Sequence, residues 1–177
     1  MRRKHNSMQA IDVLRGQLRQ AHDVLEFAIE GFTHEQLHAT FPNSTLQAPG
    51  VIYLHAVTCE DFYLSENLNT GPLIYTSQGW AEKLGIDIGN GYLTPEWCAT
   101  VRIDNLPLLR EYAQAVYAAS DAHLATLTPE DLDQLLDFYG EMRLGDFIGR
   151  IMVWHISEHG GEVAAYKGLY GMQGLPY

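Results

Sequence analysis

Two histidines near the end of the sequence are spaced so that they could share a metal ion. The segment VWHISEHGGEV, residues 153–163, places His155 and His159 four positions apart. On an α-helix this spacing puts both imidazoles on one face, one turn apart, and two such nitrogens commonly bind one ion. The same letters also match H-x-x-E-H, the signature of an inverted zinc protease. The alternatives are therefore a metal site, a protease and a pair of neighbouring core histidines.

The surrounding apolar pattern directs this pair toward the protein interior. Within residues 146–167, Ile148 and Met152 recur at helical spacing with the two histidines. His55 occupies the same kind of position in an earlier apolar pattern, which begins near Pro49. Buried imidazoles need partners, and as metal ligands they suit zinc, nickel, copper or iron. The pattern allows either hydrogen-bonded core histidines or a three-histidine metal site with an open position.

Two further residues are candidates for a fourth group at such a site. Cys59 follows His55 by one helical turn and is either a small core residue or a fourth ligand. His22 lies at the edge of the inward stripe of the first helical pattern and is either a hydrogen-bonded core histidine or a fourth group. A closed fourth ligand would favour a structural site, whereas an open position beside a pocket would favour an enzyme.

The protease alternative requires a third ligand, usually acidic, from another helix well downstream. Only residues 160–177 follow His159, and Glu162 lies on the same helix as the histidine pair. Glu158 points about 100° away from His159 around that helix. We therefore do not expect a protease.

Four long helical patterns would position the histidines. They span residues 8–29, 49–70, 104–127 and 146–167. We expect Thr33 with Gln36 to form a capping box, Thr94 to cap a short helical turn, and Asp104 to cap the third long helix. The few strand signals are LIYT and LLDFYG.

The connection between the second and third helical patterns, residues 70–102, is long for a compact domain. It is rich in glycine and aromatic residues. We expect its aromatic side chains to form one wall of a pocket; these are Tyr75, Trp80, Tyr92 and Trp97.

Composition limits the classes of function. The net charge is −11, from 22 acidic and 11 basic residues, so a nucleic-acid partner is not expected. The one basic cluster is Arg2, Arg3 and Lys4. We expect no secretory signal, because no continuous apolar run follows the basic start, and no apolar run is long enough to span a membrane. We expect a cytoplasmic protein with a single domain over residues 1–177.

Two segments resemble the DinB-like superfamily, which includes thiol-dependent transferases acting with bacillithiol or mycothiol. They are GVIYLHAVTCEDFYL, residues 50–64, and WHISEHGGEVAAYKGLYG, residues 154–171. The resemblance implies an all-α four-helix bundle with up-down-down-up topology, in which a long crossover joins the second and third helices. It also implies that His55, His155 and His159 bind a divalent metal, most often zinc or nickel, and that the protein forms a homodimer.

The function expected on this basis is a divalent-metal-dependent transferase that uses a low-molecular-weight thiol and a small-molecule substrate. The metal would stabilise the thiolate, which is the competent nucleophile. A metal-dependent hydrolase and a non-enzymatic, metal-binding or stress-related bundle remain alternatives. The sequence identifies no catalytic or cofactor-binding residue, and the three histidines are predicted only as metal ligands.

Overall fold

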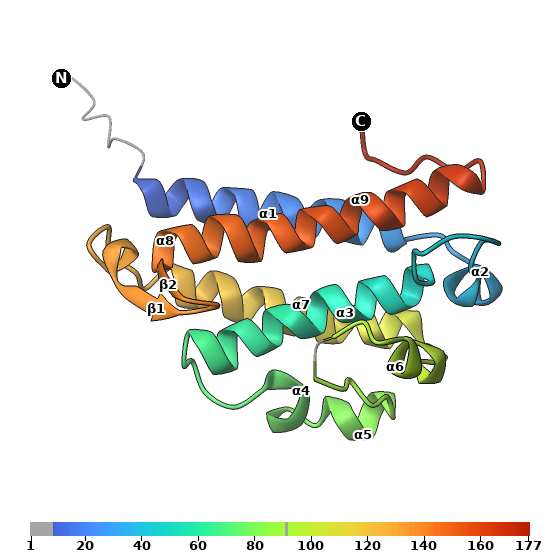
Figure 1. Ribbon diagram of the computed structural model, residues 1–177, viewed down its shortest axis with the longest axis horizontal. Coiled ribbons are helices and arrows are strands. Elements are labelled where there is room, and N and C mark those ends of the chain that lie inside the picture. The colour runs from blue at the N-terminus through green and yellow to red at the C-terminus, as the bar shows by residue number, and fades with distance from the viewer. Residues whose placement is uncertain (1–8, 91) are drawn as a thin grey trace.

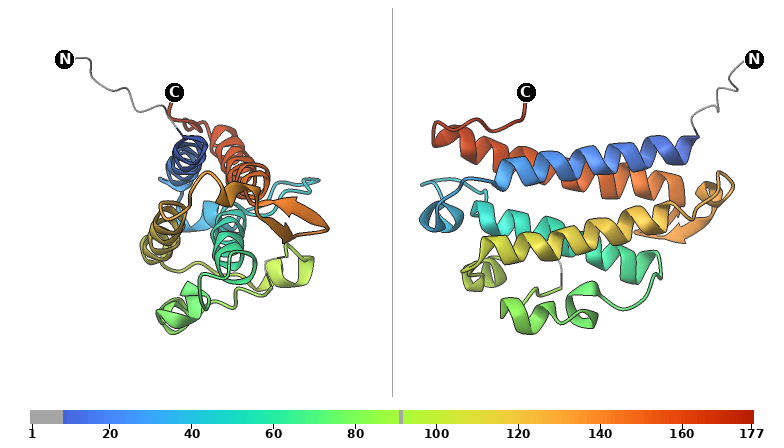
Figure 2. Two further views of the ribbon diagram at one scale, coloured as in Figure 1. Left: turned by 90° about the vertical axis from the view of Figure 1, so that its left-hand side faces the viewer. Right: turned by 180° about the vertical axis from the view of Figure 1, so that it is seen from behind.

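The computed structural model describes residues 9–90 and 92–177, and it is mostly helical. The predicted basic cluster at residues 2–4 lies outside the described residues. Four long helices lie side by side along the molecule (Figure 1) and occupy four corners when viewed end-on (Figure 2). They are α1 (Ala10–Ile29), α3 (Pro49–Phe62), α7 (Leu106–Leu124) and α9 (Trp154–Leu169).

Two of the long helices are continued by π-helical turns. The turn η1 (Tyr63–Asn67) extends α3, while α8 (Leu144–Asp146) and the π-helical η3 (Phe147–Val153) lead directly into α9. The predicted second and fourth helical patterns therefore correspond to compound helices. π-helical turns are rare and frequently occur at functional sites.

The core consists of the inward faces of these helices. In α1 the predicted apolar stripe is buried, with Leu18, Leu25 and Ile29 at most 2% exposed. In α3 every residue from Pro49 to Asp61 is buried, which goes beyond the single stripe that the sequence predicts. The difference arises because neighbouring segments cover α3 on all sides, including its outer face.

The crossover supplies part of that cover. It contains three short helices, α4 (Ile74–Ser77), α5 (Trp80–Leu84) and α6 (Pro95–Thr100). The buried carboxylate of Asp61 accepts the backbone N–H groups of Ile74 and Tyr75 at 2.8 and 2.9 Å, and the Tyr112 hydroxyl at 2.9 Å. One side chain of α3 therefore attaches both α4 and α7 to that helix.

Several local predictions are confirmed and others are corrected. Thr33 and Gln36 form the expected capping box on α2 (His34–His38), and Thr94 accepts the Trp97 N–H at the start of α6. The cap of α7 is Asn105, which accepts the Leu108 N–H at 3.0 Å, and the predicted cap, Asp104, is exposed.

The two strand signals have different outcomes. LIYT forms the helix α4 because its first backbone N–H groups are capped by the distant Asp61. LLDFYG begins with β1 (Leu135–Asp137), which pairs antiparallel with β2 (Glu141–Arg143) after the 3₁₀ turn η2 (Asp131–Asp133). No described helix is both long and apolar enough to cross a membrane.

Candidate metal centre

Three imidazoles from two helices meet between α3 and α9. His155 Nε2 lies 3.2 Å from His55 Nε2 and 3.2 Å from His159 Nε2. The ring centroids of His55 and His159 are 4.7 Å apart. The two residues of α9 share a face as the four-residue spacing predicts, and that face contacts α3 at His55. The structure thus brings together the three histidines predicted from the sequence.

The two nitrogen–nitrogen distances that His155 makes, 3.2 Å each, are close to those of metal coordination. A tetrahedral ion with metal–nitrogen bonds of about 2.0–2.1 Å separates its ligand atoms by about 3.3–3.4 Å. An imidazole nitrogen carries either one proton or one lone pair. His155 Nε2 can therefore satisfy one neighbouring nitrogen by an ordinary N–H···N hydrogen bond, but not both. The donor set is chemically suited to a divalent ion.

Cys59 belongs to the same cluster. Its Sγ lies 3.5 Å from His55 Nδ1 and 3.9 Å from His55 Nε2. Ligand atoms of His55, Cys59 and His155 all lie within 4.8 Å of one another, so this His–Cys–His group could hold a metal ion. Burial raises the pKa of the Cys59 thiol to about 12, which keeps it protonated when no ion is bound.

A carboxylate outside the cluster orients His159. Glu162 Oε2 lies 2.6 Å from His159 Nδ1, one turn along α9. Since an ionised carboxylate can only accept, Nδ1 carries the proton and the lone pair of Nε2 faces His155. This is the usual arrangement of a metal-binding histidine, whose second nitrogen donates to a carboxylate or carbonyl. The spacing of Glu162, three residues after His159 on the same helix, is the sequence signal for this supporting position.

One nitrogen of His155 is buried without a partner. Its Nδ1 is buried without a hydrogen-bond partner among the described residues. Burial, followed by charge repulsion from His159 and His55, lowers the pKa of His155 to about 3. Its imidazole is therefore neutral at physiological pH, the form that binds metals.

A pocket of about 310 Å³ opens beside the cluster. Its walls come from α3 with η1, from the crossover, from the β-hairpin and from α9. They are His55, Cys59, Phe62, Tyr63, Glu66, Asn67, Asn90, Tyr92, Phe138, Tyr139 and His155. The hydroxyls of Tyr92 and Tyr139 lie 3.1 Å apart and join the crossover to the hairpin.

The predicted aromatic wall is only partly correct. Among the crossover aromatics, Tyr92 lines this pocket, whereas Tyr75 and Trp80 pack against Tyr112 with ring centroids 5.2 and 5.9 Å away. Trp97 donates its indole N–H to the Asp87 carbonyl at 2.8 Å. The hairpin aromatics were missed, because nothing in the local sequence indicates which part of the protein a hairpin will contact.

Of the two roles that the sequence allows for His22, a fourth group at the site and a hydrogen-bonded core histidine, the structure shows the second. Its Nε2 lies 2.8 Å from Glu60 Oε2, and its ring stacks on Tyr117 at 3.8 Å between centroids. Ser120 also donates to the Glu60 carboxylate. This buried group joins α1, α3 and α7. His22 is a hydrogen-bonded core histidine whose ring packs between these helices.

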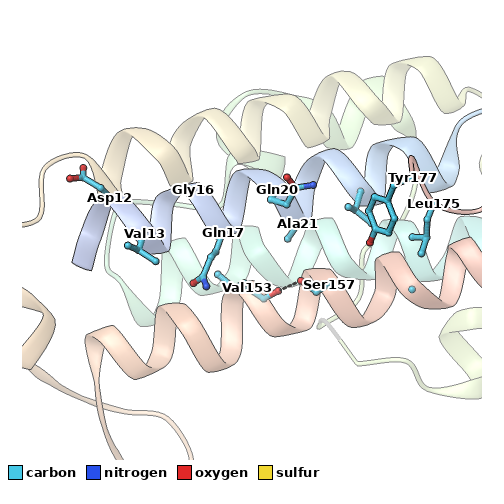
Figure 3. A pocket seen from close by; sticks show the side chains of 12 residues that line it. Asp12, Val13, Gly16, Gln17, Gln20, Ala21, Val153, Ser157, Leu175 and Tyr177 are labelled. Carbon is cyan, nitrogen blue, oxygen red and sulfur yellow. Dashed lines mark hydrogen bonds between the residues drawn. The ribbon is translucent and has the colours of Figure 1, made fainter. Parts of the chain in front are cut away.

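A larger pocket, about 860 Å³, lies elsewhere (Figure 3). It is a groove between α1 and α9 that ends at Leu175 and Tyr177. Asp12 is the only charged residue that lines it, and no histidine or cysteine does. The groove therefore lacks the groups that metal or nucleophilic chemistry needs.

Comparison with known proteins gives a family and a fold. The family model described as the DinB superfamily matches residues 17–163. A solved structure, the conserved protein of locus from Enterococcus faecalis, is similar with a TM-score of 0.78 and 21% sequence identity. The similarity covers 92% of this chain and 98% of that one. No curated protein matches.

Proposed function

This chain belongs to the DinB superfamily, and from that premise we propose that it is a divalent-metal-dependent transferase acting with a low-molecular-weight thiol. The observation that carries the proposal is the meeting of three imidazole Nε2 atoms beside a pocket with aromatic walls. His55, His155 and His159 are the proposed ligands. Zinc or nickel is the proposed ion, because both suit neutral imidazole donors.

The residues around the cluster support this chemistry. A divalent ion held by three neutral ligands supplies positive charge that stabilises a bound thiolate against protonation. Glu162 fixes the tautomer and orientation of His159. Burial raises the pKa of the Tyr63 hydroxyl, so that it stays protonated and can donate a hydrogen bond into the pocket. The aromatic walls would shield a bound thiol and electrophile from part of the solvent.

Cys59 supports a second candidate function, a metal-binding bundle without turnover. Its sulfur lies within the cluster, and a thiolate as a fourth ligand would close the site. The two candidates differ in what Cys59→Ala does. Removal of a fourth ligand would lower metal affinity strongly, whereas removal of a pocket wall would change thiol binding and leave metal affinity within a fewfold of the original.

We also assign the four long helices to an up-down-down-up bundle. In Figure 1, α1 and α9 run in one direction along the molecule and α3 and α7 in the other. Since α3 and α7 are consecutive and parallel, the chain between them must return along the bundle, which accounts for the crossover.

A homodimer is part of the proposal. The apolar groove between α1 and α9 and the exposed Val13 beside it offer a face that a second copy could cover. Sedimentation at high micromolar concentration should give twice the chain mass of 19.9 kDa. A single species at the chain mass would contradict the homodimer.

Thiol binding can be tested directly on the cobalt-substituted protein. We expect a small thiol to produce a sulfur-to-metal charge-transfer band that depends on pH, because the thiol must lose its proton to bind. The band should be absent from His155→Ala. If no thiol produces a band between about pH 6 and 9, where free thiols begin to ionise, the transferase proposal is wrong.

A further inference from the structure

The pocket beside the histidine cluster is lined at its outer end, here called the mouth, by side chains that favour a positively charged ligand. Five aromatic rings line it, and they come from three separate segments. They are Phe62, Tyr63, Tyr92, Phe138 and Tyr139. The polar side chains nearby are those of Glu66, Asn67 and Asn90, and no lysine or arginine lines the pocket.

The aromatic rings connect the metal cluster to solvent. The ring of Tyr63 lies edge-to-face with His155, 5.8 Å between centroids, and with Phe138, 5.9 Å between centroids. Tyr139 packs on Phe138 at 4.9 Å and shares its hydroxyl contact with Tyr92. Tyr92 is 58% exposed and Tyr139 is 86% exposed, so the outer rings can receive a ligand from solvent.

Glu66 is the charged residue at the outer end. It follows Cys59 by seven positions and Tyr63 by three, which places all three on one face of the α3–η1 helix. At about 1.5 Å per residue, Glu66 lies about 10 Å farther along the helix than Cys59. Helical side chains lean toward the helix N-terminus, so this carboxylate leans back toward the histidines.

The carboxylate of Glu66 is not engaged elsewhere. No hydrogen bond or ion pair joins it to another of the residues that the structure describes. Glu66 is close enough to affect Tyr92 electrostatically. The pKa of Tyr92 is raised mainly by the hydrogen bond with Tyr139 and, to a smaller extent, by the negative charge of Glu66. An anionic group at the mouth would meet this carboxylate with no cation to offset it.

We propose that the pocket takes a thiol that also carries an alkylammonium group, with the sulfur toward His55 and His155 and the cation at the mouth. The placement of the thiol rests on the proposed function, whereas the placement of the cation rests on the aromatic rings and Glu66 at the mouth. Aromatic faces attract organic cations, and aromatic cages are the characteristic binding sites for quaternary ammonium groups. Glu66 adds an opposite charge. The two ends of the pocket therefore fit a ligand that is anionic at the sulfur and cationic about 10 Å away.

The cation site can be tested without the metal or the thiol. Choline and its neutral carbon isostere, 3,3-dimethyl-1-butanol, have the same shape and differ in charge. Titration of each into the chelator-treated full chain, followed by amide NMR shifts of residues 62–67, 92 and 138–139, measures both affinities. We expect choline to bind about tenfold more tightly than the isostere.

Variants separate the contributions to this preference. Glu66→Gln should weaken choline binding about threefold and leave the isostere unchanged, as expected for an exposed charge. Tyr139→Leu should weaken choline more than the isostere, since it removes an aromatic face. Glu111→Gln, an exposed charge on α7 outside the pocket, is the matched control and should change neither. Equal affinities for the two ligands, or no saturable binding of choline, would overturn the proposal.

A second titration distinguishes failure of this inference from failure of the proposed function. The cobalt-substituted protein is titrated with thiocholine, 2-mercaptoethanol and 3-mercaptopropionate, which are cationic, neutral and anionic. Thiocholine should give the charge-transfer band at the lowest concentration and 3-mercaptopropionate at the highest. Bands of equal affinity would overturn the cation site and leave the transferase proposal standing. Absence of every band, with choline preference retained, would overturn the transferase and support the cation site.

Discussion

Replacement of Glu162 by glutamine tests whether the histidine cluster is a metal site, without removing a ligand. The Glu162 carboxylate accepts a hydrogen bond from His159 Nδ1, with 2.6 Å between the oxygen and the nitrogen, and the side chains of Glu162 and His159 are 29% and 9% exposed. Glutamine keeps the size and one acceptor oxygen but loses the negative charge that makes His159 a stronger donor. Loss of such a supporting partner typically lowers metal affinity 10–100-fold.

Partial exposure and the remaining amide acceptor place the expected effect at the lower end of that range. Glu162→Gln should weaken metal affinity about tenfold, or about 1.4 kcal/mol. Competition with a chromogenic chelator at neutral pH measures this, and thermal unfolding of the metal-free variant shows whether the fold is intact. Glu162→Ala, which leaves no acceptor, should approach the upper end, about 100-fold.

Glu158 provides the matched control. It lies on the same helix between the two histidines, is exposed and is not part of the cluster. Glu158→Gln makes the same charge change and should alter metal affinity less than twofold. If Glu158→Gln and Glu162→Gln lower metal affinity equally, the effect comes from the net charge of the helix. That result would refute the claim that Glu162 orients His159 for metal binding.

Three further predictions concern stability. Because burial, followed by repulsion from the other two histidines, lowers the pKa of His155 to about 3, the unfolded chain binds a proton between about pH 3 and 6.5 that the folded chain does not. The free energy of unfolding of the metal-free protein, measured by urea denaturation, should therefore fall by about 2 kcal/mol from pH 7 to pH 5. In His155→Gln this free energy should depend less steeply on pH. His22→Ala leaves the buried Glu60 carboxylate without one of its hydrogen-bond partners and should cost about 3 kcal/mol in the same assay, while metal affinity stays unchanged. Asp61→Asn places an amide donor against a backbone N–H and should release the crossover, seen as faster proteolysis within residues 70–102.

Local features of the fold were predictable because their signals are local. The α1 stripe, the capping box at Thr33 and the turn capped by Thr94 each depend on residues within about one helical turn. The histidine pair is of the same kind, since spacing alone sets its common face. The contact of this pair with His55 follows from the apolar patterns that bury both helices, and the structure brings the three imidazoles together.

Features that depend on distant partners were predicted less well. LIYT forms a helix because Asp61, on another element, caps it. His22 pairs with Glu60 rather than approaching the cluster, since the two lie on facing helices in a register that neither segment specifies. The pocket wall formed by Phe138 and Tyr139 likewise depends on where the hairpin packs.

Metal content of the purified protein tests the central claim most directly. We predict about one divalent ion per chain by elemental analysis, and loss of most of it in each of His55→Ala, His155→Ala and His159→Ala. The far-ultraviolet helix signal should largely survive, because the apolar stripes still specify the fold. Full occupancy in all three variants would contradict the three-histidine site.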